Sequence, residues 1–162
     1  MHQFNNMEFL NSALNTGCFV TSGDNPMVCS WGMVGVMWHK KVFVAPIRVS
    51  RHTSKLIDET GVFTVSVPYA GTFKKELAFC GTKSGRDYDK WAETGMEKQP
   101  AKSVDTCVVK GCEKYYECKV VGVVPMTEDM DVSAVSNWYP TSETYPNGDR
   151  HIFYFGEIIE EY

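Results

Sequence analysis

The chain has 162 residues, a formal net charge of −4 and 43% hydrophobic residues, which is usual for a globular protein with a single core. This charge gives no general reason to expect a nucleic-acid or membrane partner, and no apolar run reaches the roughly 18 residues of a spanning helix. The first residues lack the basic start and apolar core of a secretion signal, so we expect one cytoplasmic domain over residues 1–162.

Short apolar runs bordered by Gly, Pro or Asn dominate the chain and predict β-strands. The predicted strands are 18–23, 26–32, 41–48, 62–68 and 151–159, together with a strand, a turn near Gly111 and a long strand over 106–126. Gly122 is expected to mark a turn or a bulge in this last region. In the run 62–68, alternation predicts one apolar face and one hydroxyl-bearing face.

Three short helices are predicted between the strands, at 53–60, 72–80 and 84–95. The first has Gly61 as its stop, and the third begins at an N-cap Ser84 and ends at Gly95. Dense strands with inserted helices predict a mainly β protein, a small barrel rather than a doubly wound parallel sheet. The polar, turn-rich segment 127–150 is either a loop over a site or a long surface excursion.

The six cysteines predict neither disulfides nor a metal site. Nothing marks the chain as secreted, and cytosolic thiols are usually reduced. Cys107, Cys112 and Cys118 are not spaced as CxxC zinc ligands. We therefore expect free, mostly buried thiols.

The stretch "RVSRHTSK" (48–55) gathers groups that bind anions, directly before a predicted helix. The N-terminus of a helix presents unpaired N–H groups, to which this stretch adds two arginines, a histidine and three hydroxyls. This combination suits a phosphate group. The alternative is that Ser50 or Thr53 caps the helix while Arg48 and Arg51 are solvated.

Two further stretches suit parts of a ligand. In "CGTKSGRDYDKW" (80–91), glycines would let the backbone approach a flat ligand, and Lys83, Arg86 and Lys90 supply positive charge. The alternative there is a glycine turn before a capped helix. The stretch "DNPMVCSWGMVGVMWHK" (24–40) has the methionines and tryptophans that suit a planar aromatic ligand, or a methionine-rich core strand. Together the three stretches favour one planar, phosphorylated ligand.

Five motifs, in this order and spacing, resemble the flavin reductase-like, FMN-binding split-barrel proteins, and within them the flavoredoxin-type branch. They are "NPMVCSWG" (25–32), "RVSRHT" (48–53), "FTVSVP" (63–68), "CGTKSGRDYDK" (80–90) and a final strand with "FYFGEI" (153–158). The resemblance extends from about residue 17 to the C-terminus. This sequence departs from the family in the first motif, where Pro26 and Val28 replace residues that more often carry hydroxyls.

The resemblance implies a split β-barrel that binds FMN non-covalently, as a homodimer with the flavin near the subunit interface. The residues that would line the flavin ring are Asn25, Met27, Cys29, Ser30 and Trp31. Those that would hold the phosphate are Arg48, Ser50, Arg51, His52 and Thr53. Those that would close over the flavin or its phosphate are Cys80, Gly81, Thr82, Ser84, Gly85 and Lys90, with Lys83 or Lys90 beside the reduced ring.

The implied activity is that of an FMN oxidoreductase which passes electrons from NAD(P)H to an acceptor that the sequence does not identify. Hydride transfer to flavin needs no protein acid or base, and the one weak catalytic candidate is His151, whose alternative is an ordinary strand-edge histidine. A second hypothesis is an FMN-bearing electron carrier, reduced by a partner protein. A third is a binding module that has lost flavin and binds another phosphorylated ligand.

Overall fold

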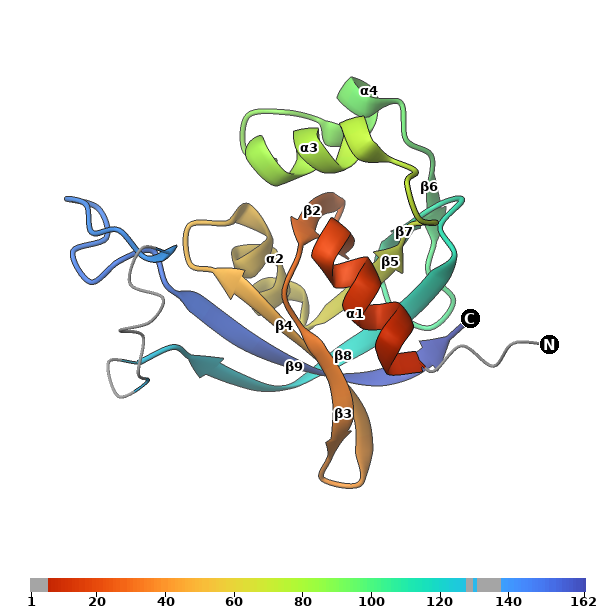
Figure 1. The fold of residues 1–162 in the computed structure, drawn as a ribbon, viewed down its shortest axis with the longest axis horizontal. Helices are drawn as coiled ribbons and strands as arrows, with labels where there is room; N and C mark the ends of the chain where they lie inside the picture. The colour runs from red at the N-terminus through yellow and green to blue at the C-terminus, as the bar shows by residue number, and fades with distance from the viewer. Residues whose placement is uncertain (1–5, 128–129, 131–137) are drawn as a thin grey trace.

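The structure, a computed structural model, describes residues 6–127, 130 and 138–162 (Figure 1). Its elements in chain order are α1 (Asn6–Thr16), β1 (Cys18–Ser22), β2 (Asn25–Cys29), β3 (Met33–Met37), β4 (Lys40–Arg48), α2 (His52–Thr60), β5 (Val62–Val67), α3 (Lys74–Thr82), α4 (Lys90–Thr94), β6 (Lys98–Pro100), β7 (Cys107–Val109), β8 (Lys114–Pro125) and β9 (His151–Glu161). Within this part of the chain, no helix is long and apolar enough to cross a membrane.

Seven antiparallel strands form the main sheet in the order β2-β1-β5-β8-β9-β4-β3, and β6 pairs with β7 in a small second sheet. The main sheet curls until β2 contacts β4, although four strands separate them in the ladder. The Cys29 thiol on β2 lies 3.9 Å from the carbonyl oxygen of Pro46 on β4. The mainly β fold with short inserted helices is therefore confirmed, and its curl brings two distant strands to one side.

Both faces of the central strand β5 are buried. Its apolar side chains join the larger core cluster, which Leu10 and Leu14 of α1 also enter. On the other face, the Thr64 hydroxyl donates to the Cys107 carbonyl at 2.6 Å, and the Ser66 hydroxyl accepts from the Val109 N–H at 3.0 Å. The predicted alternation holds, but the hydroxyl-bearing face is also buried. It lies under β7, whose backbone groups form hydrogen bonds with the two hydroxyls.

The prediction of a helix over 84–95 places its start too early, because α4 begins at Lys90. Residues 84–88 form turns, in which the N–H groups of Asp87 and Tyr88 donate to the Ser84 carbonyl, each at 3.1 Å. The Asp89 carboxylate accepts from the N–H groups of Trp91 and Ala92, so Asp89 is the N-cap and the helix begins one residue later. Aspartate at this position captures two unpaired donors of the first turn.

Other predictions stand as made or need smaller corrections. The strand predicted over 26–32 ends at Cys29, and β3, β6 and α1 were not predicted. The turn near Gly111 lies between β7 and β8, and the β8–β9 register shifts between Val120 and Gly122, which confirms the irregularity there. All six cysteines are free and buried, as predicted.

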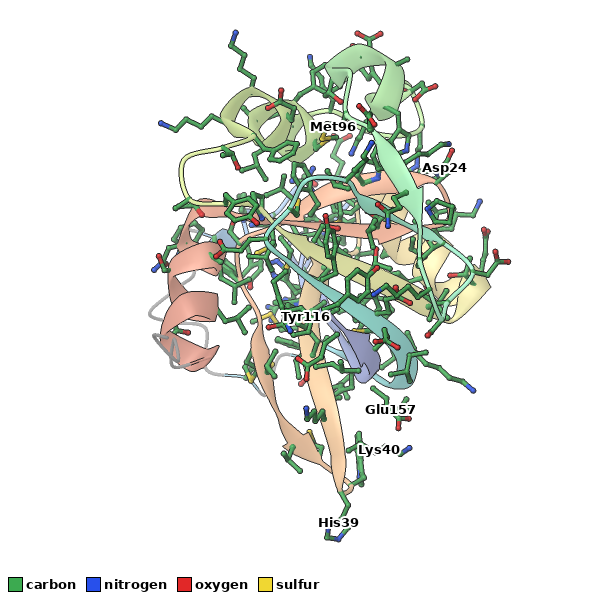
Figure 2. All side chains as sticks on the ribbon, turned by 90° about the vertical axis from the view of Figure 1, so that its right-hand side faces the viewer. Asp24, His39, Lys40, Met96, Tyr116 and Glu157 are labelled. Carbon is green, nitrogen blue, oxygen red and sulfur yellow. The ribbon has the colours of Figure 1, made fainter. Side chains whose placement is uncertain are left out.

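Two parts of the molecule project from the sheet at opposite ends. Helices α3 and α4 lie together at one end, and the β3–β4 hairpin extends at the other (Figure 1). His39 lies at the tip of this hairpin, and Lys40, the first residue of β4, forms an ion pair of 2.7 Å with Glu157 on β9 (Figure 2). The region between β2, α2, α3 and α4 therefore stands apart from the hairpin end.

Gly156 on β9 tests the packing of the core. A Cβ atom there would lie 2.5 Å from Cζ of Phe63 and 2.7 Å from Cβ of Cys118, inside the buried core. We expect Gly156→Ala to lower the free energy of unfolding by roughly 1–3 kcal/mol, because overpacking forces neighbours from their positions. Urea denaturation measures this change.

The matched control is Gly35→Ala in β3, where a Cβ atom would meet nothing within 4 Å. That variant should change the free energy of unfolding by less than about 0.5 kcal/mol, as surface substitutions do. Equal effects of the two substitutions would contradict the packing described for β9.

Candidate functional site

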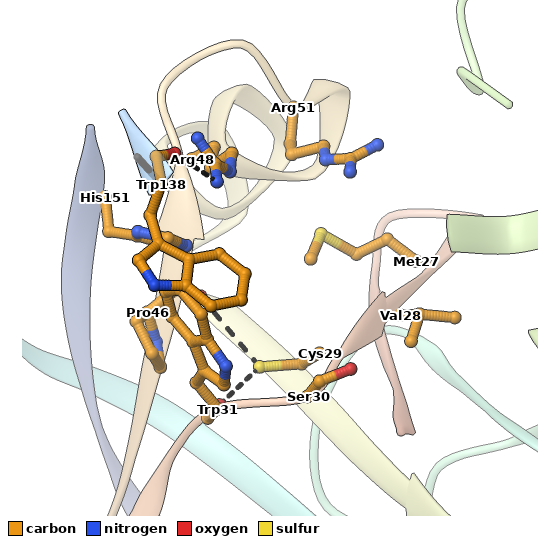
Figure 3. Close-up of a pocket in the computed structure, with 10 residues that line it drawn as sticks. All are labelled: Met27, Val28, Cys29, Ser30, Trp31, Pro46, Arg48, Arg51, Trp138 and His151. Carbon is orange, nitrogen blue, oxygen red and sulfur yellow. Dashed lines mark hydrogen bonds between the residues drawn. The ribbon is translucent and has the colours of Figure 1, made fainter. Parts of the chain in front are cut away.

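Two cavities lie side by side along β2 and share Met27 and Arg51 in their walls. The first, of about 250 Å³, is lined by aromatic rings that include Trp31 and His151, and we call it the aromatic cavity (Figure 3). The second, of about 100 Å³, is the basic cavity, and its cationic side chains are those of Arg51, Lys83, Arg86 and Lys90.

The N-terminus of α2 opens into the basic cavity without a side-chain cap. Arg51 occupies the N-cap position, and no side chain among the described residues caps the helix. The Ser54 hydroxyl donates instead to the Arg51 carbonyl at 2.8 Å. Capping by Ser50 or Thr53, the alternative considered from sequence, is thus not what the structure has. The exposed positive end of the helix is available to an anion.

His52, the first residue of α2, has a ring nitrogen that is buried without a hydrogen bond. Its Nδ1 finds no partner in the described part of the chain. Burial, with the nearby charge of Arg86, lowers the pKa of His52, so the ring is neutral at pH 7. An orphaned ring nitrogen in a cavity wall is a place where a ligand can bind, because buried polar atoms are normally paired.

The cationic side chains of the basic cavity have no ion-pair partner among the described carboxylates. Lys90 is 4% exposed, and its ammonium donates to the carbonyls of Pro26 at 2.8 Å and Cys80 at 3.1 Å. Burial lowers the pKa of Lys90. Arg86 donates to the Ser50 carbonyl at 3.1 Å. Four cationic side chains without an ion-pair partner among the described residues therefore border a cavity that suits an anion.

A close contact holds the glycine-rich segment against β2. The Asn25 amide donates to the Thr53 hydroxyl at 2.8 Å, and both side chains are buried. A Cβ atom on Gly85 would overlap the Asn25 amide oxygen, so only glycine fits there. The predicted residues that line the basic cavity are Asn25, Met27, Ser50, Arg51, His52, Thr53, Thr82, Lys83, Ser84, Gly85 and Lys90.

The aromatic cavity is lined by the predicted residues Met27, Cys29, Ser30, Trp31, Arg48 and Arg51, and by Val28, Pro46, Trp138 and His151. Its thiol is not reactive: burial raises the pKa of Cys29 to about 12, and the thiol donates to the Trp31 carbonyl at 2.7 Å. A neutral thiol is a poor nucleophile. The cavity offers flat rings beside the side chains of two arginines, Arg48 and Arg51, which suits a planar ligand with polar groups.

His151 lies in the wall of the aromatic cavity, at the start of β9. Its Nδ1 is 2.9 Å from the Tyr139 hydroxyl, and its ring lies 5.0 Å from the Trp31 ring. Burial and the nearby Arg48 charge lower the pKa of His151 to about 4, so the ring is neutral at pH 7. The weak catalytic candidate thus contacts the cavity but has no ionised form to offer at that pH.

Two groups of predicted residues have other contacts. Arg48 donates to the carbonyls of Asp149 and Trp138, both at 2.8 Å, and the Ser50 hydroxyl donates to the Asp149 carboxylate at 2.6 Å. Cys80 and Gly81 line neither cavity: the Cys80 side chain lies in the second core cluster, and Gly81 lies against Val28. Trp138, Pro46 and Val28 were not predicted for a site, and Arg86 was predicted only to supply positive charge, without being named among the cofactor-binding residues.

Comparison with known proteins places this site in a family. The family model described as "Flavin reductase like domain" matches residues 13–160. An uncharacterized protein of Archaeoglobus fulgidus is 30% identical over 119 residues, which cover 72% of this chain and 66%, slightly less than two thirds, of that protein.

Solved structures share the fold. Flavoredoxin of Desulfovibrio vulgaris (Miyazaki F) has a TM-score of 0.68 at 20% identity, with 90% of this chain and 68% of that chain covered. An FMN-binding protein from Thermus thermophilus, with bound p-hydroxybenzaldehyde, has a TM-score of 0.66 at 17% identity, with 90% of this chain and 70% of that chain covered. The NADH:FAD oxidoreductase of Streptomyces globisporus C-1027 has a TM-score of 0.66 at 15% identity, with 90% of this chain and 74% of that chain covered.

The family match includes nearly the whole chain and all five motifs on which the resemblance was based. It also includes both cavities and every residue predicted to contact the cofactor. The chain belongs to the flavin reductase-like domain family.

Proposed function

We propose that this chain binds FMN non-covalently, with the phosphate in the basic cavity and the flavin ring in the aromatic cavity. The observation that carries this proposal is the set of unpaired donors at the start of α2: an uncapped helix end, the orphaned Nδ1 of His52 and the cations around it. A phosphate group supplies several acceptor oxygens and negative charge at one point. The adjoining aromatic cavity receives the planar part of the same ligand.

The two cavities divide the predicted cofactor-binding residues by their chemistry. For the phosphate we assign Arg51, His52, Thr53, Lys83 and Ser84, with Arg86 added. For the ring we assign Met27, Cys29, Ser30 and Trp31, which follow one another along β2 and the residues after it. The name of the Thermus thermophilus neighbour as an FMN-binding protein supports this choice of ligand.

We further propose that the protein is an oxidoreductase that takes electrons from NAD(P)H. FMN, when bound, supplies a ring that accepts a hydride. The chain contributes binding and shielding: Trp31 and the neutral His151 form the wall of the cavity, and Lys90 contributes positive charge near it. The Streptomyces globisporus neighbour, an NADH:FAD oxidoreductase, supports this activity.

A second candidate is an electron carrier with no NAD(P)H site, reduced by a partner protein. The likeness to flavoredoxin favours it. Both candidates place FMN at the same residues, and we propose a cytoplasmic location for either.

Arg51 tests the phosphate assignment. We expect Arg51→Ala to weaken FMN binding by roughly 1–3 kcal/mol, because a charge-assisted hydrogen bond is lost. Riboflavin, which has no phosphate, should bind with nearly the same affinity to both proteins. Fluorescence titration measures each affinity.

The control is Lys55→Ala, a cation on the same helix whose ammonium pairs with Glu59 outside the cavities. It should leave both affinities unchanged. If Arg51→Ala weakens the binding of riboflavin as much as the binding of FMN, Arg51 contacts the ring and not the phosphate.

An anaerobic absorption spectrum distinguishes the two activities. We expect the flavin absorption of the loaded protein to bleach on addition of NADH or NADPH, because FMN accepts a hydride from a nicotinamide. Bleaching by dithionite alone would support the electron carrier. A protein that takes up no FMN would contradict both.

We also propose that the chain forms a homodimer through the hairpin end of the sheet. Apolar side chains are exposed there: Met33 is 60%, Val36 74% and Trp38 58% exposed. The Trp38 ring lies 6.0 Å from the Phe155 ring, and the exposed Val123 lies on the neighbouring β8. A contiguous apolar surface of this kind is typical of a protein interface.

The substitution Val36→Lys tests this surface. We expect the variant to dissociate at concentrations where the native protein is dimeric, with a dissociation constant raised about tenfold or more by the buried charge. Sedimentation analysis measures the mass. Tyr69→Lys, an exposed aromatic away from the hairpin, is the control and should remain dimeric. A monomeric native protein would contradict the proposal.

A further inference from the structure

The segment 138–150, which we call the strap, borders the aromatic cavity at one end. The strap enters this cavity only through Trp138, whose side chain lies in the wall. The indole ring stands 5.3 Å from the Trp31 ring at 80°, an edge-to-face contact, and Figure 3 shows both rings on the side of the pocket opposite Met27 and Val28. Trp138 is 53% exposed, so the ring has one side toward the cavity and one toward solvent.

One guanidinium group holds both ends of the strap. Arg48 donates through Nη2 to the Trp138 carbonyl and through Nη1 to the Asp149 carbonyl, each at 2.8 Å. The two acceptors are eleven residues apart in sequence but are bound by the same planar side chain. Because Arg48 is at the end of β4, it fixes the strap to the sheet.

The Asp149 carboxylate completes this attachment. It accepts from the Ser50 N–H at 3.1 Å and from the Ser50 hydroxyl at 2.6 Å, and one of its oxygens is 4.0 Å from Nη1 of Arg48. Arg48 and Ser50 are two of the five residues predicted to hold the phosphate. A carboxylate of the chain itself occupies them instead, which leaves the phosphate to the basic cavity.

We propose that Trp138 covers the ring of the bound flavin and that Asp149 is the positioning residue that keeps it there. The proposal rests on the proposed FMN site, and it concerns how long the cofactor stays bound. With the strap attached, FMN must pass Trp138 to leave the cavity. Without the Asp149 carboxylate, the strap loses its bonds to Ser50 and only the Arg48 bonds to its carbonyls remain, so Trp138 is held less firmly against Trp31 and the ring leaves more readily.

The experiment measures FMN dissociation from the loaded protein, by the recovery of flavin fluorescence after rapid dilution. We expect Trp138→Ala and Asp149→Ala each to accelerate dissociation, by about five- to tenfold, the factor expected for the loss of one aromatic contact. The double variant should dissociate no faster than the faster single variant, because both substitutions remove the same cover.

Two controls separate this role from general loss of structure. Glu143→Ala removes an exposed carboxylate elsewhere on the strap and should leave the rate unchanged. Asp149→Asn keeps an oxygen that can accept from the Ser50 N–H and should restore a rate close to that of the native protein. Thermal denaturation checks that all variants remain folded.

Different failures point to different errors. If the native protein retains FMN but neither Trp138→Ala nor Asp149→Ala changes the dissociation rate, the strap does not cover the ring, and the FMN site itself stands. If Asp149→Ala slows dissociation, the carboxylate competes with the phosphate for Arg48 and Ser50, and the positioning role is wrong. If the native protein binds no FMN, the proposed function fails, and this inference fails with it.

Discussion

The buried ammonium of Lys90 is the constraint on which the site depends. It comes from α4 and donates to a carbonyl of α3 and to a carbonyl of β2, which lies 64 residues earlier in the chain, so it joins three elements. A buried cation without an opposite charge is costly. The carbonyl oxygens supply partial charge, and the anion that we propose for the adjacent cavity would supply the rest. The same side chain therefore fixes the geometry of the cavity and favours the charge of its ligand.

Strand β2 determines how the two cavities relate. Met27 and Arg51 belong to both, while Asn25 borders only the basic cavity and Trp31 only the aromatic cavity. One ligand with an anionic end and a planar end can thus occupy both cavities. The curl of the main sheet matters for this arrangement, because it brings Pro46 of β4 opposite Cys29 and forms the far wall of the aromatic cavity.

Much of this site could be predicted from local chemistry, and the rest could not. The stretches 48–53 and 80–90 carry charge, hydroxyls and glycines within a few residues, so binding of an anion could be predicted for them. Trp138 and Asp149 are different: each is about a hundred residues from its partner on β4 or after it, in a segment without periodicity. The cap of α4 was predicted at Ser84, but Asp89 is an equally good N-cap, and the turn formed by residues 84–88 makes Asp89 the cap.

The motif "RVSRHT" shows why a cluster of charges does not identify a single ligand site. It spans the last residue of a strand and the first residues of a helix, so its side chains leave the backbone in two directions. Arg48 pairs in register with His151 and reaches the strap, whereas Arg51 and His52 face the basic cavity. One short motif thus serves two purposes: its strand end anchors a distant segment, and its helix end is free for the anion.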